Sequence, residues 1–209
     1  MRTRGQILDA AGVLFAALGY ETATVVDLLS HSGVTKGAFY FHFSSKEDVA
    51  RALFSEQSPR LDPVAPQKFR LQELVDGHLV LTSRLRNGAR ERGCFRLCLE
   101  QGLDEEFRRN WYLDRVLFDE ELLTAAREAG ELAACVAVRE TAECLISASM
   151  GLQLMSQTVI DDADTGMERR IAQLLRNVMS DIAMPDVYAE LDISQDRGIR
   201  LLEESGAVL

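Results

Sequence analysis

The sequence predicts an all-α protein in which a small three-helix head is followed by a larger helical body. Apolar residues recur at helical spacing near the N-terminus and again beyond residue 70. A glycine turn and one short helix fit residues 33–43, and three of the four prolines lie within residues 58–66. These observations place the head at residues 1–45, a connecting helix at 46–57 and the body at 58–209.

The first two helices of the head have recognisable ends. An apolar stripe predicts a helix from about residue 4 to residue 18, ended by Gly19. The stripe consists of Ile7, Ala11, Leu14, Phe15 and Leu18. The second helix begins at Thr24, where Asp27 completes a capping box, and it stops before Gly33. It is short, as the first helix of a helix-turn-helix should be.

Residues 33–43 read as the turn and second helix of that motif. Thr35 starts the helix, and the apolar rings of Phe39 and Phe43 lie four residues apart on one face. The other face carries small and polar groups that suit phosphates and base edges. These are Thr35, Lys36, the bare backbone of Gly37, Tyr40 and His42. We therefore predict a DNA-recognition helix here.

The connecting helix begins with a cap and an unusual lysine. Ser45 caps it, with Asp48 three residues later, and Lys46 occupies the first turn. A lysine there opposes the helix dipole, so it is expected to serve another purpose. Phosphate contact is the purpose that we predict.

The net charge of −10 works against DNA binding at long range. Residues 1–50 carry four basic and five acidic side chains, so the head supplies no general positive field. Two of the three lysines nevertheless fall at the two helix starts expected to face DNA, Lys36 and Lys46. Binding is therefore expected to depend on these placed groups and on a dimer that doubles them.

The body reads as a series of helices. They are expected at about residues 71–85, 91–101, 104–128, 138–160 and 165–182, with Pro185 ending the last. The final two are the predicted homodimer interface, because an apolar stripe on the last could pair with small residues on the one before it. That stripe is Ile171, Leu174, Leu175, Val178 and Ile182. Packing of both helices into their own core is the alternative.

Several function classes are disfavoured. No apolar run approaches the roughly 20 residues of a membrane span and no secretory signal opens the chain, so a cytoplasmic location is expected. The cysteines are expected to be reduced thiols without a metal: Cys94, Cys98, Cys135 and Cys144. The acidic segment 161–166 lacks the full ligand set of a calcium loop. No catalytic motif or phosphate-binding glycine loop occurs, so neither catalysis nor a cofactor is expected.

Residues 4–54, above all 33–43 followed by 45–47, resemble the head of TetR-family transcriptional repressors. Residues 40–43, 71–76, 155–157 and 183–185 are similar to the subgroup of γ-butyrolactone autoregulator receptors of Streptomyces and its relatives. The resemblance implies a dimeric repressor that leaves its operator when a small, mostly apolar signalling lactone enters the body. It also implies control of antibiotic production or morphological differentiation.

The same resemblance assigns DNA-binding positions. They are Thr35, Lys36, Gly37, Tyr40, His42 and Lys46. Lys36 is expected to read a guanine edge, and Tyr40, His42 and Lys46 to hold phosphates. Aromatic packing within the head is an equally good interpretation of Tyr40 or His42 taken alone.

The resemblance also points to residues of a ligand pocket. Trp111, the only tryptophan, matches a tryptophan that lines the cavity of this subgroup, although by itself it would be read as core. Gln57, beside the hinge, is a candidate polar anchor or a solvated side chain. Met150 is a weaker candidate, because a thioether commonly fills core space.

Two other functions fit the same sequence. One is a pseudo-receptor or drug-responsive TetR repressor that answers to a different ligand. The other is a helical interaction or ligand-binding protein without DNA binding, which the charge of the head would allow.

Overall fold

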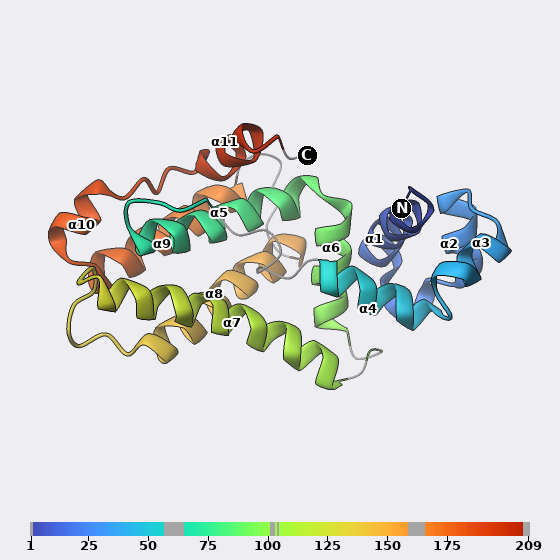
Figure 1. The fold of residues 1–209 in the computed structure, drawn as a ribbon, viewed down its shortest axis with the longest axis horizontal. Helices are drawn as coiled ribbons and strands as arrows, with labels where there is room; N and C mark the ends of the chain where they lie inside the picture. Colours follow the sequence, from blue (N-terminus) through green and yellow to red (C-terminus); the bar gives the residue numbers. More distant parts are fainter. Residues whose placement is uncertain (1, 57–64, 101–102, 104, 159–165, 207–209) are drawn as a thin grey trace. The chain divides into compact units, whose positions relative to one another are not determined.

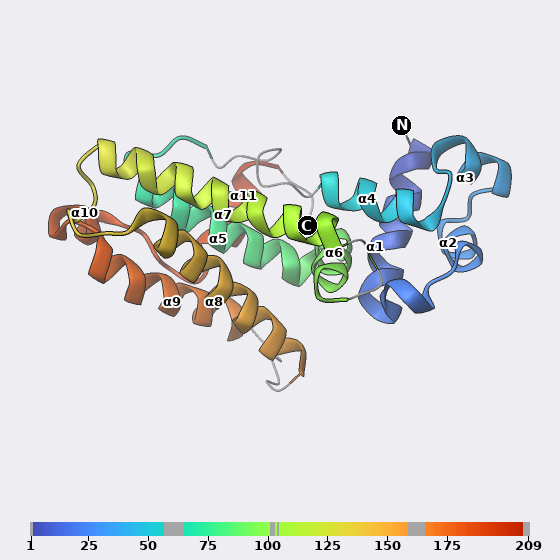
Figure 2. The same ribbon diagram turned by 90° about the horizontal axis from the view of Figure 1, so that it is seen from below.

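A computed structural model describes residues 2–56, 65–100, 103, 105–158 and 166–206, and the named elements in these ranges are all α-helices (Figures 1 and 2). They are α1 (Arg2–Thr22), α2 (Val25–Ser32), α3 (Lys36–His42), α4 (Lys46–Glu56), α5 (Arg70–Asn87), α6 (Ala89–Leu99), α7 (Glu105–Glu128), α8 (Val138–Thr158), α9 (Gly166–Ile182), α10 (Pro185–Glu190) and α11 (Arg197–Glu204). The all-α prediction is confirmed. Within these ranges, no helix is both long and apolar enough to cross a membrane.

The chain forms two compact units. Unit 1 comprises residues 1–61 and 85–113, and unit 2 comprises residues 62–84 and 114–209. Helices α5 and α7 each contribute residues to both units. The helix α6 therefore groups with the head, although the sequence had placed everything beyond residue 58 in the body.

The core of unit 1 contains the apolar residues expected from the sequence. Ile7, Phe15, Leu28 and Phe39 are all fully buried. One member of the predicted α1 stripe differs, because Leu18 is 43% exposed. Helical geometry breaks at Gly19, with φ 78° and ψ 173°, as predicted, but the helix resumes for a last short turn to Thr22.

A carboxylate from α6 explains the conformation at this break. Glu100 accepts a hydrogen bond from the backbone nitrogen of Tyr20 at 2.6 Å. Its Oε1 lies only 2.2 Å from where a Cβ at position 19 would be, so a side chain there would displace the Glu100 carboxylate, and the positive φ itself favours glycine.

Helices α1 and α6 meet at a close crossing of two glycines. A Cβ on Gly93 would lie 2.5 Å from the carbonyl oxygen of Gly12, and a Cβ on Gly12 would lie 2.6 Å from Cα of Arg90. Near this crossing, Arg90 hydrogen-bonds to Asp9 at 2.7 Å and to Glu56 of α4 at 2.9 Å. These contacts and the Glu100 bond fix α6 to the head at several points along its length.

Helix α5 is the most completely buried helix of unit 2 among those described. Its apolar side includes Leu71, Leu74, Val75 and Leu79, as predicted. The helix also buries polar side chains, namely Gln72, Glu73, Asp76, His78, Thr82 and Ser83. Its first turn is capped by Glu131, whose carboxylate accepts the backbone N–H groups of residues 70 and 71 at 2.9 Å each.

The segment after Pro185 forms two short helices that the sequence did not predict, and it is held to α5 by the C-terminal clasp. We use this name for Gln72, Asp76, Asp192 and Arg197. The guanidinium of Arg197 donates to both oxygens of the fully buried Asp76, at 2.5 and 2.8 Å. The amide of Gln72 exchanges two hydrogen bonds with the backbone of Asp192, at 2.8 and 3.1 Å.

The Asp192 carboxylate is stabilised in its charged form. Partial burial would raise its pKa, but hydrogen bonds from Ser194, Arg200 and Arg197 outweigh that effect and lower the pKa to about 2. Asp192 therefore keeps its charge throughout the physiological pH range.

Helices α8 and α9 use most of the predicted stripe inside their own chain. Ile171, Leu175 and Ile182 are at most 6% exposed, whereas Leu174 and Val178 are half-buried. On α8 the exposed positions include a row made of Cys144, Ser147, Gly151, Leu154 and Met155. The alternative of packing within one chain thus holds for three of the five stripe residues, and this row on α8 remains available to another molecule.

Candidate nucleic-acid interface

The turn between α2 and α3 is built by local hydrogen bonds. The Thr24 hydroxyl accepts the Asp27 backbone N–H at 3.2 Å, and the Asp27 carboxylate accepts the Thr24 backbone N–H at 2.9 Å, which completes the predicted capping box. The Thr24 hydroxyl also donates to the Asp27 carboxylate at 2.6 Å, and this bond and the one from the Thr24 backbone N–H lower the pKa of Asp27. Gly33 then ends α2 with φ 67° and donates its N–H to Leu29.

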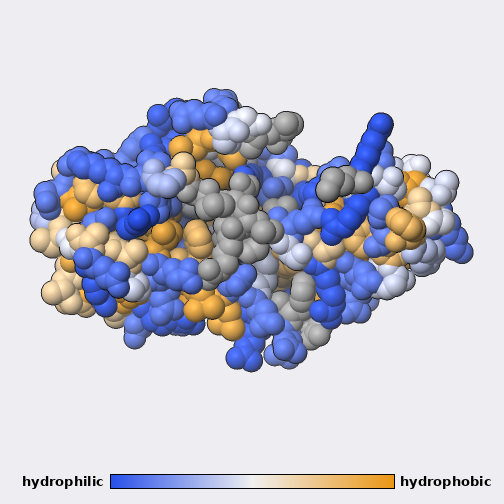
Figure 3. All heavy atoms as spheres, viewed as in Figure 1, coloured by the Kyte–Doolittle hydropathy of each residue, from blue (hydrophilic) through white to orange (hydrophobic). Residues whose placement is uncertain are grey.

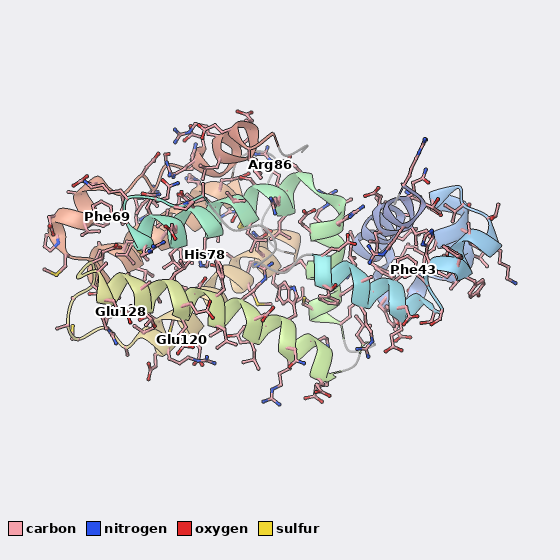
Figure 4. All side chains as sticks on the ribbon, viewed as in Figure 1. Phe43, Phe69, His78, Arg86, Glu120 and Glu128 are labelled. Atoms are coloured by element: carbon pink, nitrogen blue, oxygen red, sulfur yellow. The ribbon has the colours of Figure 1, made fainter. Side chains whose placement is uncertain are left out.

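Helix α3 is oriented by its cap and its two buried rings. Thr35 caps it by accepting the backbone N–H of Ala38 at 3.2 Å. Phe39 is fully buried and Phe43, labelled in Figure 4, is 5% exposed. Because these two rings anchor one face, the opposite face of α3 is directed to solvent.

That outer face carries most of the predicted DNA-binding groups. Thr35, Lys36 and Gly37 are exposed, and Tyr40 is 49% exposed with its ring edge-on to Phe39 at 5.3 Å. A Cβ added to Gly37 would meet no atom within 4 Å, so packing inside the protein does not require glycine there. A bare backbone at this point suits the close approach of a partner.

Sequence reasoning missed the most exposed large apolar side chain on α3. Phe41 is 83% exposed, and its ring lies edge-on to the half-buried His42 at a centroid distance of 5.0 Å. The sequence did contain a signal for this exposure. In a helix whose residues 39 and 43 point inward, residue 41 points away from that face. The hydropathy colouring in Figure 3 likewise shows apolar side chains at the surface of the head.

Lys46 has partners inside the protein. Its ammonium donates to the carbonyl oxygens of Tyr20 at 2.5 Å and Ala23 at 2.8 Å, and it lies 4.2 Å from the centroid of the Tyr20 ring. These carbonyls are at the end of α1, where a cation is favourable. The structure thus gives a second explanation for a lysine in the first turn of α4, beside the predicted phosphate contact.

Replacing Lys46 with methionine should distinguish these explanations. If the lysine mainly caps α1, the variant loses about 1.5 to 3 kcal/mol of unfolding free energy, and the salt dependence of operator affinity is unchanged. If it holds a phosphate, the slope of log affinity against log salt falls by about 1. We expect the stability loss, measured by urea unfolding. An unchanged unfolding curve would argue against the capping role.

The charge is unevenly divided between the units. Unit 1 contains 12 basic and 11 acidic residues, whereas unit 2 contains 11 basic and 22 acidic residues. All of the excess negative charge therefore belongs to unit 2. This distribution weakens the electrostatic objection to DNA binding by the head.

Two of the three predicted ligand-binding residues, Trp111 and Met150, lie in the described parts of the chain. Trp111 is half-buried in unit 1, and its ring lies edge-on to that of Phe54 on α4, at a centroid distance of 6.2 Å. Met150 is half-buried on α8 in unit 2. Gln57 lies outside the described residues. Trp111 therefore links α7 directly to α4.

Comparison with known proteins identifies the family. Residues 7–57 match the family model for bacterial regulatory proteins of the tetR family. The A-factor receptor protein of Streptomyces griseus is 31% identical over 191 residues, which cover 91% of this chain and 67% of that protein.

Solved structures give the same result. TylP, a TetR regulator from Streptomyces fradiae, superposes with a TM-score of 0.87 and 34% identity over 98% of this chain and 97% of that chain. CprB from S. coelicolor A3(2) shares the fold, with a TM-score of 0.76 and 24% identity over 97% of this chain and 98% of that chain. The chain belongs to the TetR family of bacterial transcriptional regulators, whose members are DNA-binding proteins and not enzymes, and it is similar over most of its length to a γ-butyrolactone receptor of that family.

Proposed function

We propose that this TetR-family repressor binds operator DNA as a homodimer and is released by a small, mostly apolar signalling molecule such as a γ-butyrolactone. The observation that carries the DNA-binding part is α3, which buries Phe39 and Phe43 and exposes Thr35, Lys36 and Gly37. Similarity to the A-factor receptor over 91% of the chain supports the ligand class. The regulated processes would be antibiotic production or morphological differentiation.

The outer face of α3 provides both kinds of contact that an operator needs. Lys36 would read a guanine edge, and the open backbone of Gly37 would allow the helix to enter the major groove. Tyr40 and His42 would hold phosphates and fix the register. Lys46 would join them only if its ammonium left the carbonyl groups of α1.

The exposed row on α8 and the half-buried residues of α9 support the dimer. Cys144, Ser147, Gly151 and Leu154 repeat at helical spacing along one side of α8, and the small ones permit close approach of another helix. A two-fold axis through such a face would present two heads to half-sites about 34 Å apart.

Two contacts support a route from the ligand to the head. Trp111 contacts Phe54 of α4, and the glycine crossing attaches α6 to α1. A ligand that favours one arrangement of α7 would therefore act on α4, which belongs to unit 1. A difference in affinity of a few kcal/mol between two arrangements would clear an operator.

A gel-shift titration on the protein's own upstream DNA tests the proposal. The natural chain should form a complex at low salt, and a γ-butyrolactone should dissolve it. Lys36→Ala should lose about 1 to 3 kcal/mol of discrimination between the operator and a variant at the contacted base pair. Lys68→Ala, which removes an exposed lysine from unit 2, is the matched control.

Each outcome has a distinct meaning. No complex even at low salt would favour a helical ligand-binding protein without DNA binding. A complex that the lactone does not dissolve would favour a pseudo-receptor or a drug-responsive repressor. Unchanged discrimination in Lys36→Ala would remove this residue from base reading.

A further inference from the structure

Three polar side chains from three helices of unit 2 form a hydrogen-bonded chain. His78 of α5 places Nε2 2.8 Å from Oδ2 of Asp119 on α7, and Nδ1 3.3 Å from Oγ of Ser149 on α8. His78 and Asp119 are 6% and 4% exposed, whereas Ser149 is half-buried. Figure 4 labels His78 on the side of α5 that faces α7. The chain thus runs from a buried carboxylate to a partly accessible hydroxyl.

The three helices that carry this chain bury apolar side chains and also further polar ones, among them Thr82, Ser83 and Arg115. The same three helices bury Leu74, Val75, Leu79, Val116, Leu123, Leu145 and Ile146. In a protein interior, apolar side chains of similar size are often as stable as a buried hydrogen-bonded polar pair, or more so, because the pair must first be desolvated. The pair is therefore weak evidence for a purely stabilising role, and its contact with the partly accessible Ser149 allows a binding role.

Burial along the inner face of α8 decreases from Ser149 onward. Ala142, Leu145 and Ile146 are at most 5% exposed, but the next positions on that face are half-buried, namely Ser149, Leu152, Gln153 and Ser156. Met150, already a predicted ligand residue, is half-buried beside Ser149. Unit 2 thus packs tightly around the first half of α8 and leaves side chains accessible along the second half.

The hydrogen-bonding capacity of the chain determines what it can recognise. When Asp119 is ionised it only accepts, so in a neutral His78 the ring proton is on Nε2, which donates it to the carboxylate in a hydrogen bond. Nδ1 is then an acceptor and takes the hydrogen of the Ser149 hydroxyl. The Ser149 oxygen keeps its lone pairs. The negative charge of Asp119, acting through His78, makes this oxygen a stronger hydrogen-bond acceptor. The Ser149 oxygen can therefore accept a hydrogen bond from a donor group of another molecule.

We propose that Ser149 Oγ is the polar anchor of the ligand site and accepts a hydrogen bond from a hydroxyl group of the ligand, with His78 and Asp119 as positioning residues. This inference rests on the proposed function and specifies its ligand as an apolar small molecule that carries a free hydroxyl. A pocket that is mostly apolar needs only a few such groups to orient its ligand.

The test compares two probes on the full-length protein by isothermal titration calorimetry. One probe is a synthetic alkyl γ-butyrolactone with a hydroxymethyl group, and the other is its O-methyl ether, which cannot donate. The natural protein should prefer the alcohol. Ser149→Ala should bind the alcohol about five- to tenfold more weakly and bind the ether unchanged. Asp119→Asn should lower the alcohol-to-ether preference in the same direction.

Ser156→Ala is the matched control, because this half-buried serine of α8 donates its hydroxyl to the carbonyl of Gln153 in its own helix. It should keep the preference for the alcohol. If the natural protein binds the lactone but Ser149→Ala shows the same preference, the anchor is wrong and the proposed function stands. If the natural protein binds neither probe, the proposed ligand class fails and the anchor fails with it.

Discussion

Gly93→Ala should lower the free energy of unfolding of unit 1 by about 2 to 3 kcal/mol, because the new methyl group would overlap the backbone of α1. The overlap is with the carbonyl oxygen and Cα of Gly12, at 2.5 and 2.8 Å, and neither atom belongs to a side chain that could rotate away. Helices α1 and α6 would have to separate. Trp111, the only tryptophan, packs against the core of unit 1, so its fluorescence during urea unfolding measures the effect.

Gly37→Ala is the matched control for this prediction. Its new Cβ would meet no atom within 4 Å, and alanine favours helix by up to about 1 kcal/mol. Stability should therefore stay level or rise, while operator affinity falls if the backbone of Gly37 approaches DNA. Equal unfolding curves for Gly93→Ala and the natural chain would show that α6 is not fixed to the head at this crossing.

Asp76→Ala should destabilise unit 2 by about 3 to 5 kcal/mol, because it leaves the Arg197 guanidinium without its main partner. The Asp76 side chain is completely buried and that of Arg197 is 15% exposed, so water can replace the lost carboxylate only poorly. The change should appear in urea unfolding followed by circular dichroism. Release of α11 from α5 should also make the C-terminal segment sensitive to protease.

The double variant Asp76→Leu/Arg197→Leu separates the cost of an orphaned charge from the value of the pair. It should recover much of the stability lost in Asp76→Ala, because both charges are removed together. Arg200→Ala, which removes an exposed partner of Asp192, should cost no more than about 1 kcal/mol. A loss in Asp76→Ala as small as that of Arg200→Ala would contradict the structural importance of the clasp.

The head was largely predictable because local interactions define it. The capping box of Thr24 and Asp27 and the helix cap of Thr35 each join residues only three apart, and Phe39 and Phe43 follow helical spacing. The long helix α7 was predicted from residue 104 to residue 128 and is found at Glu105–Glu128. Where the bonding is local, the sequence pattern and the structure agree.

The remaining features depend on residues far apart in the chain. Lys46 finds its carbonyl partners 23 and 26 residues earlier, and Arg197 finds Asp76 at a separation of 121 residues. His78 looked like one more member of an apolar helix face, because its partner Asp119 lies 41 residues away. Hydrophobic periodicity carries no information about pairs so far apart in the chain. The sequence prediction therefore assigned α6 to the body and did not include α10 and α11.

The separation of charge between the two units has a consequence for the search for an operator. A DNA duplex that meets unit 2 encounters 11 excess negative charges and is repelled, whereas unit 1 is close to neutral. We therefore expect collisions of DNA with unit 2 to be short-lived, and sliding on unrelated DNA to gain little electrostatic stabilisation. We therefore expect the acidic unit 2 to reduce the amount of protein bound to non-specific DNA and to favour encounters in which DNA meets unit 1.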